Sequence, residues 1–159
     1  MDTLLSVTLK WIHLIATVAW IGGMFTNFFI YLPSMAKTLE PQVAGRLMGA
    51  VMKRFRIMVY VSMAVFLLSG ILLGQMDLNP GVSVTARNEV VNILIFKIPL
   101  FVLMVILAIV AFEVVAPRAA RLAAEGPSPG LQKAQRTQKI MAVIGFILGL
   151  IILVLSAAL

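Results

Sequence analysis

A single histidine, His13, lies in a long apolar stretch near the start of the chain, and it is the only histidine among 159 residues. Polar and aromatic residues recur around it at helical spacing. The helix face that contains it comprises Lys10, His13, Thr17, Trp20, Met24, Asn27 and Tyr31. Because lipid disfavours polar side chains, we expect this face to contact protein or a cofactor, and we expect the chemistry of the protein to take place there.

The imidazole of His13 suits three roles: an axial ligand of haem iron, a copper ligand or a proton relay. A hydrogen bond across a helix interface is the structural alternative. The chain has no cysteine, so it has no thiolate for a metal site. With one histidine, a bis-histidine haem needs a second chain. The second ligand is therefore either a different side chain, with Met76, Met104 and Lys97 as candidates, or the site lies at an oligomer interface.

Lys97 interrupts the apolar run from Val90 to Val115. Its ammonium group has three possible roles: extending to the membrane surface, pairing with a carboxylate such as a porphyrin propionate, or serving as a ligand when neutral. Lys10 and Lys97 are both cations, whereas the acids predicted on the same side lie near the surface. This charge pattern favours an anionic guest between the helices.

The elements that position these residues follow from composition. The chain is 62% hydrophobic and 12% charged, with a mean hydropathy of +1.07, which indicates an integral membrane protein. Four segments are long enough to span a bilayer, at about 4–32, 57–75, 89–116 and 140–159. We therefore predict an all-α, four-helix membrane bundle, one transmembrane domain over 1–159, with a short amphipathic helix at about 41–52 in the first loop. The sequence shows no evident internal repeat.

Basic residues define a topology. They concentrate in the loops 33–56 and 117–139, so the positive-inside rule places both loops in the cytoplasm and both termini outside. We expect a multi-pass protein of the bacterial inner membrane. The chain has a basic pI, but the charges responsible for it lie in these short loops, so the pI does not indicate a nucleic-acid partner. Counted from the outer side, His13 and Lys97 lie at similar depths in the membrane. The residues of the second helix at that depth are Ser69 and Gly70. We predict that His13 and Lys97 face a shared interior.

Three further residues of the first helix are candidates for contact with a cofactor. Trp20 lies near the middle of the membrane, so its ring should stack on a flat ligand or fill the helix interface. Thr17 and Met24 lie on the same face. Gly22 and Gly23 would let a neighbouring helix approach closely, which favours packing.

The sequence resembles a known family in several short motifs. It is similar to the copper-resistance protein D-like membrane family and to the related four-helix, haem-binding bacterial protoporphyrinogen oxidases. The motifs that carry the resemblance are Lys10-Trp11-Ile12-His13-Leu14, Trp20-Ile21-Gly22-Gly23-Met24, Tyr31-Leu32-Pro33, Met52-Lys53-Arg54-Phe55-Arg56, Ser69-Gly70, Phe96-Lys97 and Pro117-Arg118. The oxidase resemblance implies a haem or porphyrin site at His13 and Lys97. The copper-resistance resemblance implies copper handling in the membrane.

Three functional hypotheses follow. The first is a membrane redox protein that binds haem b through His13 and either exchanges electrons with a quinone or oxidises a porphyrinogen as an oxidoreductase. The second is a copper transport or resistance protein, with His13 and a methionine as ligands. The third is an accessory membrane subunit without a cofactor. The expected partners are the lipid bilayer, a quinone or porphyrin, and a second copy of the chain.

Overall fold

The computed structural model describes residues 2–77 and 83–157, and these residues form helices and short connections with no strand among them. Four helical stretches are long and apolar enough to cross a membrane: Thr3–Met35, Gln42–Asp77, Arg87–Glu125 and Pro129–Ser156. The predicted all-α, four-helix membrane architecture is thereby confirmed. The spans include the predicted segments, apart from the last residues of the chain, and extend further into the basic regions.

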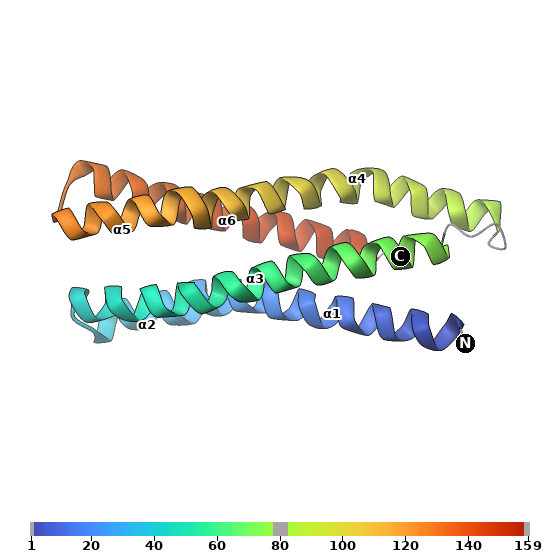
Figure 1. Cartoon of the computed structure of the whole chain (residues 1–159), viewed down its shortest axis with the longest axis horizontal. Coiled ribbons are helices and arrows are strands. Elements are labelled where there is room, and N and C mark those ends of the chain that lie inside the picture. The colour runs from blue at the N-terminus through green and yellow to red at the C-terminus, as the bar shows by residue number, and fades with distance from the viewer. Residues whose placement is uncertain (1, 78–82, 158–159) are drawn as a thin grey trace. The chain divides into compact units, whose positions relative to one another are not determined.

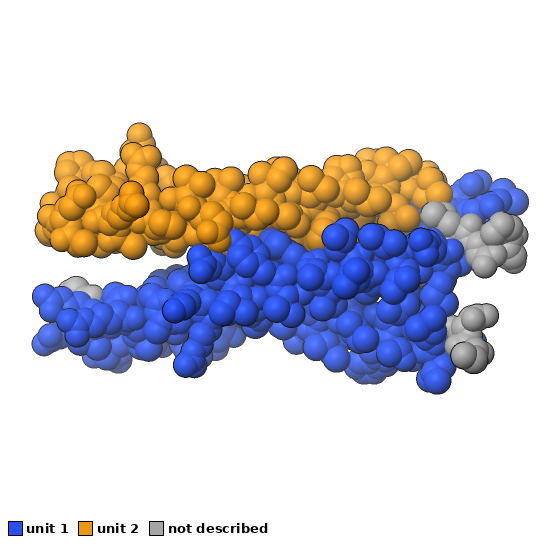
Figure 2. All heavy atoms as spheres, in the orientation of Figure 1, with its two compact units in different colours: residues 1–90 blue, residues 91–159 orange. Residues whose placement is uncertain are grey.

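The chain divides into two compact units, 1–90 and 91–159 (Figure 2). Unit 1 contains α1 (Asp2–Thr26), the π-helix η1 (Asn27–Tyr31), α2 (Leu32–Thr38) and α3 (Pro41–Asp77). Unit 2 contains most of α4 (Val84–Ile109), the π-helix η2 (Val110–Val115), α5 (Ala116–Glu125) and α6 (Pro129–Ala157). Each unit is a helical hairpin, in which a long helix runs out and another returns (Figure 1).

Each outgoing helix widens into a π-helical segment two residues before a proline. The backbone N–H of Leu32 donates to the carbonyl of Asn27, and that of Ala116 donates to the carbonyl of Ala111. Both bonds span five residues instead of four. A proline ring clashes with the carbonyl four residues before it and cannot donate to that carbonyl. We infer that the wider turn makes room for Pro33 and Pro117, so the helix continues past each proline.

The predicted short helix at 41–52 is helical, but it is not separate. It forms the first turns of α3, which runs without a break from Pro41 to Asp77. The residues between it and the apolar segment, Met52 to Arg56, are good helix formers and include no glycine or proline. The charged residues at this point do not end the helix. The short helix α2 is not separate either, because it continues α1 and η1 past Pro33.

A three-residue turn, 126–128, joins α5 to α6. Gly126 adopts a φ of +104°, a conformation that residues with a side chain rarely adopt. The backbone N–H of Leu131 donates to Ser128 Oγ at 3.2 Å, so Ser128 caps the first turn of α6. The turn is short because α6 begins directly after it, at Pro129.

The core of unit 1 is the interface between α1 and α3, which pack closely against each other. The buried residues of α1 lie seven, four and four positions apart, which places them on one face of the helix: Leu9, Ala16, Trp20 and Met24. Val59, at 1% exposure, is the most buried side chain of α3. At Gly23 the helices are so close that an added Cβ would lie 2.7 Å from Met58 Cε and 2.7 Å from Phe55 Cε2.

Unit 2 packs most closely near its connecting end. Among the described residues of this unit, the backbone of α6 comes close to η2 and to α5. Ala119 of α5 and Ala134 of α6 are buried there. Small side chains at these positions let the two helices come together next to the turn.

Candidate functional site around His13

The candidate site is a hydrogen-bonded chain that links α1 to α3 within unit 1. His13 Nδ1 lies 2.7 Å from Ser69 Oγ, and Ser69 Oγ donates to the carbonyl of Val65 at 2.6 Å. Ser69 is 3% exposed and His13 is half-buried. The sequence placed His13 level with Ser69 by depth alone, and the hydrogen bond confirms that alignment.

This chain assigns the proton on the imidazole. A serine hydroxyl has one hydrogen, and here that hydrogen points to the carbonyl of Val65. Ser69 Oγ must therefore accept from His13, so the ring carries its hydrogen on Nδ1. The lone pair of the neutral ring then lies on Nε2, the nitrogen that can act as a metal ligand or a base.

The aromatic ring of Phe66 on α3 packs against the imidazole, and the ring of Trp20 on α1 packs against Phe66. The ring of Phe66 lies 4.9 Å from that of His13, tilted by 57°. Trp20 stacks on the same phenylalanine at 5.8 Å and 27°. With 3% exposure, Trp20 fills the helix interface, so the structure favours its packing role over stacking on a ligand. Phe66 was not among the sequence candidates, because a phenylalanine in an apolar helix carries no chemical signal.

The other predicted residues of the α1 face differ in their placement. Met24 is buried, and Thr17 is half-buried with its hydroxyl donating to the carbonyl of His13 at 2.9 Å. Lys10 is exposed, and so is Tyr31. The buried arc includes Leu9 and Ala16, so it is centred slightly to one side of the predicted stripe.

Asn27 is the second buried polar feature of unit 1. It is 7% exposed, and its Oδ1 has no hydrogen-bond partner in the described part of the chain. A buried amide oxygen without a partner is costly in free energy. The residue begins η1, where the backbone departs from regular helix geometry.

The remaining candidates lie on other helices. Lys97 is half-buried on α4, Met104 of the same helix is 5% exposed, and Met76 is half-buried near the end of α3. Lys97 and Met104 belong to unit 2, whereas His13 and Met76 belong to unit 1. The shared interior for His13 and Lys97 therefore stays a prediction. Among the described residues, no group of three or more histidine, cysteine, aspartate or glutamate side chains could hold a metal ion.

Comparison with known proteins gives one match. A family model with the description "Domain of unknown function (DUF4149)" matches residues 15–128 of the chain, which is more than half of its length. No curated protein matches, and no solved structure matches. The matched range includes Ser69, Lys97 and both π-helical segments, and it begins two residues after His13.

Proposed function

We propose that this chain, which belongs to the DUF4149 family, is an integral membrane protein that binds haem through His13. The single observation that supports the proposal is the hydrogen-bonded chain from His13 through Ser69 to the carbonyl of Val65. Histidines that bind metals commonly donate their second ring N–H to an oxygen of the protein, which fixes the ring orientation and raises the basicity of the ligand nitrogen.

The residues of unit 1 suit this role chemically. Ser69 accepts from Nδ1, so Nε2 carries the lone pair that an iron ion would take. Phe66 packs against the imidazole and Trp20 stacks on Phe66, so the two rings contribute apolar surface near the proposed ligand nitrogen. Bound haem would supply reversible one-electron chemistry. The sequence resemblance to haem-binding membrane proteins points in the same direction.

An absorption spectrum tests the proposal. The protein would be expressed with added haem precursor, purified in detergent and measured in its oxidised and reduced forms. We expect a Soret band that His13→Ala removes. Leu14→Ala, an exposed neighbour on α1, is the matched control and should retain the band. A wild-type protein that folds but shows no Soret band contradicts the proposal.

We also infer the orientation of the protein in a bacterial inner membrane. The connecting end of each hairpin carries basic residues: Lys37, Arg46, Lys53 and Arg54 in unit 1, and Arg118, Arg121, Lys133, Arg136 and Lys139 in unit 2. The positive-inside rule supports a cytoplasmic location for both connecting ends. Since the chain has no cysteine, single substitutions such as Ala124→Cys and Thr85→Cys give a clean test with a membrane-impermeant thiol reagent. In intact cells only Thr85→Cys should react.

A further inference from the structure

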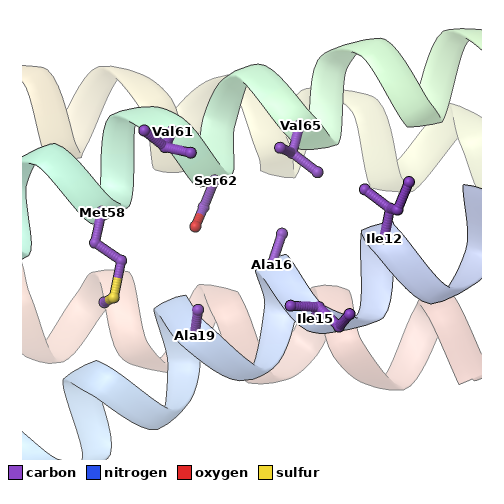
Figure 3. Close-up of a pocket in the computed structure, with 8 residues that line it drawn as sticks. All are labelled: Ile12, Ile15, Ala16, Ala19, Met58, Val61, Ser62 and Val65. Atoms are coloured by element: carbon purple, nitrogen blue, oxygen red, sulfur yellow. The ribbon is translucent and has the colours of Figure 1, made fainter.

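A groove next to the hydrogen-bonded chain of His13 runs between α1 and α3 in unit 1 (Figure 3), and Val65 belongs to both. Its volume is about 360 Å³. The lining residues are Ile12, Ile15, Ala16, Ala19, Met58, Val61, Ser62 and Val65. This size is within the range of small-molecule sites, which are mostly apolar with a few well-placed polar groups.

The groove has one polar side chain, Ser62, and its hydroxyl points into the open space (Figure 3). The hydroxyl groups of Thr17 on α1, Ser69 on α3 and Ser156 on α6 each donate to the carbonyl four residues before them. Ser62 makes no such bond within the described residues, although it is 3% exposed. A buried donor that is not used by its own helix is suited to an acceptor on a ligand.

We propose that this groove binds a membrane-soluble quinone, whose carbonyl oxygen accepts a hydrogen bond from Ser62 Oγ. An acyl chain would fit the apolar walls but would leave the hydroxyl without a partner. A charged ligand is disfavoured because the described residues that line the groove include no charged side chain. Ile15 and Val61 on the rim are 63% and 57% exposed, so a ligand dissolved in the bilayer has a route of entry.

This inference goes beyond the haem proposal and does not depend on it. Ala16 lies three residues after His13, so a quinone in the groove would be about one helical turn from the imidazole along α1. That separation would suit electron exchange if both ligands bind. Quinone binding itself needs only the groove and Ser62, and it can be measured in protein that contains no haem.

Fluorescence quenching by decyl-ubiquinone gives the measurement. The chain has two tryptophans, Trp11 and Trp20, so a Trp11→Phe background leaves Trp20 as the only reporter, one residue after Ala19 of the groove. In lipid nanodiscs we expect saturable quenching by the quinone. Ser62→Ala should weaken the apparent affinity about 3- to 10-fold, the effect of one hydrogen bond. Ser156→Ala removes a hydroxyl from another helix and should not change the affinity.

A second variant and a competing ligand keep the test decisive. Ala19→Leu places a larger side chain in the groove and should abolish saturable quenching, whereas Val18→Leu, an exposed neighbour, should not. Decylbenzene has the ring and chain without a carbonyl, so it should compete poorly. Equal affinities of wild type, Ser62→Ala and Ala19→Leu would overturn the proposal. Equally strong competition by decylbenzene would overturn it as well, since the groove would then hold any apolar chain.

The His13→Ala variant separates this proposal from the haem proposal. If His13→Ala loses the Soret band and keeps the quenching by quinone, both sites are supported and they are independent of each other. Quenching in a protein that never shows a Soret band supports the quinone groove and contradicts the haem site. A Soret band without saturable quenching contradicts the groove alone.

Discussion

The two hairpins place an ionisable side chain at the same distance from their prolines, and they surround it differently. His13 lies twenty residues before Pro33, and Lys97 lies twenty residues before Pro117. When the two hairpins are aligned on these prolines, the two π-helical segments fall at matching positions. Buried Trp20 of unit 1 then corresponds in sequence position to buried Met104 of unit 2. The structure thus reveals a shared construction that the sequence, read without it, did not suggest.

The difference lies in the polar groups. Unit 1 has a hydrogen-bonded histidine, two buried serines on α3 and a buried asparagine at the start of η1. In the same register, unit 2 has Ala111 in place of Asn27. The two hairpins therefore share the pattern of proline and π-helical segment but not the buried polar residues. We infer that unit 1 carries the ligand chemistry, at a cost in stability, and that unit 2 repeats the supporting framework.

The largest effect is expected at the closest helix contact of unit 1. Gly23→Leu must push Phe55 and Met58 away, so it should lower the free energy of unfolding by up to about 3 kcal/mol. A Cβ added at Gly22 or Gly145 would meet no atom within 4 Å, so Gly22→Leu and Gly145→Leu are controls and should be near neutral. Thermal unfolding in one detergent measures all three. Equal losses in the three variants would contradict the tight helix contact at Gly23.

A gain in stability is expected when Asn27 is made to resemble its counterpart in unit 2. Asn27→Leu removes a buried oxygen that has no partner among the described residues, so it should raise the free energy of unfolding by about 2 kcal/mol. Asn92→Leu, at an exposed position of α4, should change little. A loss of stability in Asn27→Leu would mean that the amide has a partner in the membrane.

The coupling between His13 and Ser69 should be smaller. A double-mutant cycle with His13→Ala and Ser69→Ala should give a coupling free energy of about 1 kcal/mol, the contribution of one hydrogen bond. Thr38→Val, which removes an exposed hydroxyl far along the chain, should be additive with His13→Ala. Additivity of His13→Ala with Ser69→Ala would show that the hydrogen bond does not contribute in the membrane.

The sequence predicted the parts of this structure that depend on hydropathy and helical rise. Four apolar runs correspond to four spans, and residue counting placed His13 level with Ser69. It could not give the side-chain rotation that brings Phe66 between His13 and Trp20, because that depends on how α3 packs on α1. It also does not distinguish Gly22 from Gly23, although only Gly23 lies at the contact.

Other differences have equally local causes. Charged residues indicate the end of an apolar segment, yet Lys53 and Arg54 continue α3 because water solvates charged side chains on a helix as readily as on a loop. Pro33 and Pro117 indicate interruptions, and the structure has π-helical turns that the sequence did not specify. The sequence did not indicate whether the side chains of Ser62 and Asn27 have hydrogen-bond partners, because that depends on how the neighbouring helix packs.

The central claim, that Ser69 fixes the proton of His13 on Nδ1, has a direct test. The chain has one histidine, so ¹⁵N-labelled histidine gives a single pair of ring resonances in the haem-free protein. We predict a protonated Nδ1 and an unprotonated Nε2, and we expect Ser69→Ala to shift the ring toward a mixture of tautomers. A proton found on Nε2 in the wild-type protein, with Nδ1 as the acceptor, would contradict the account.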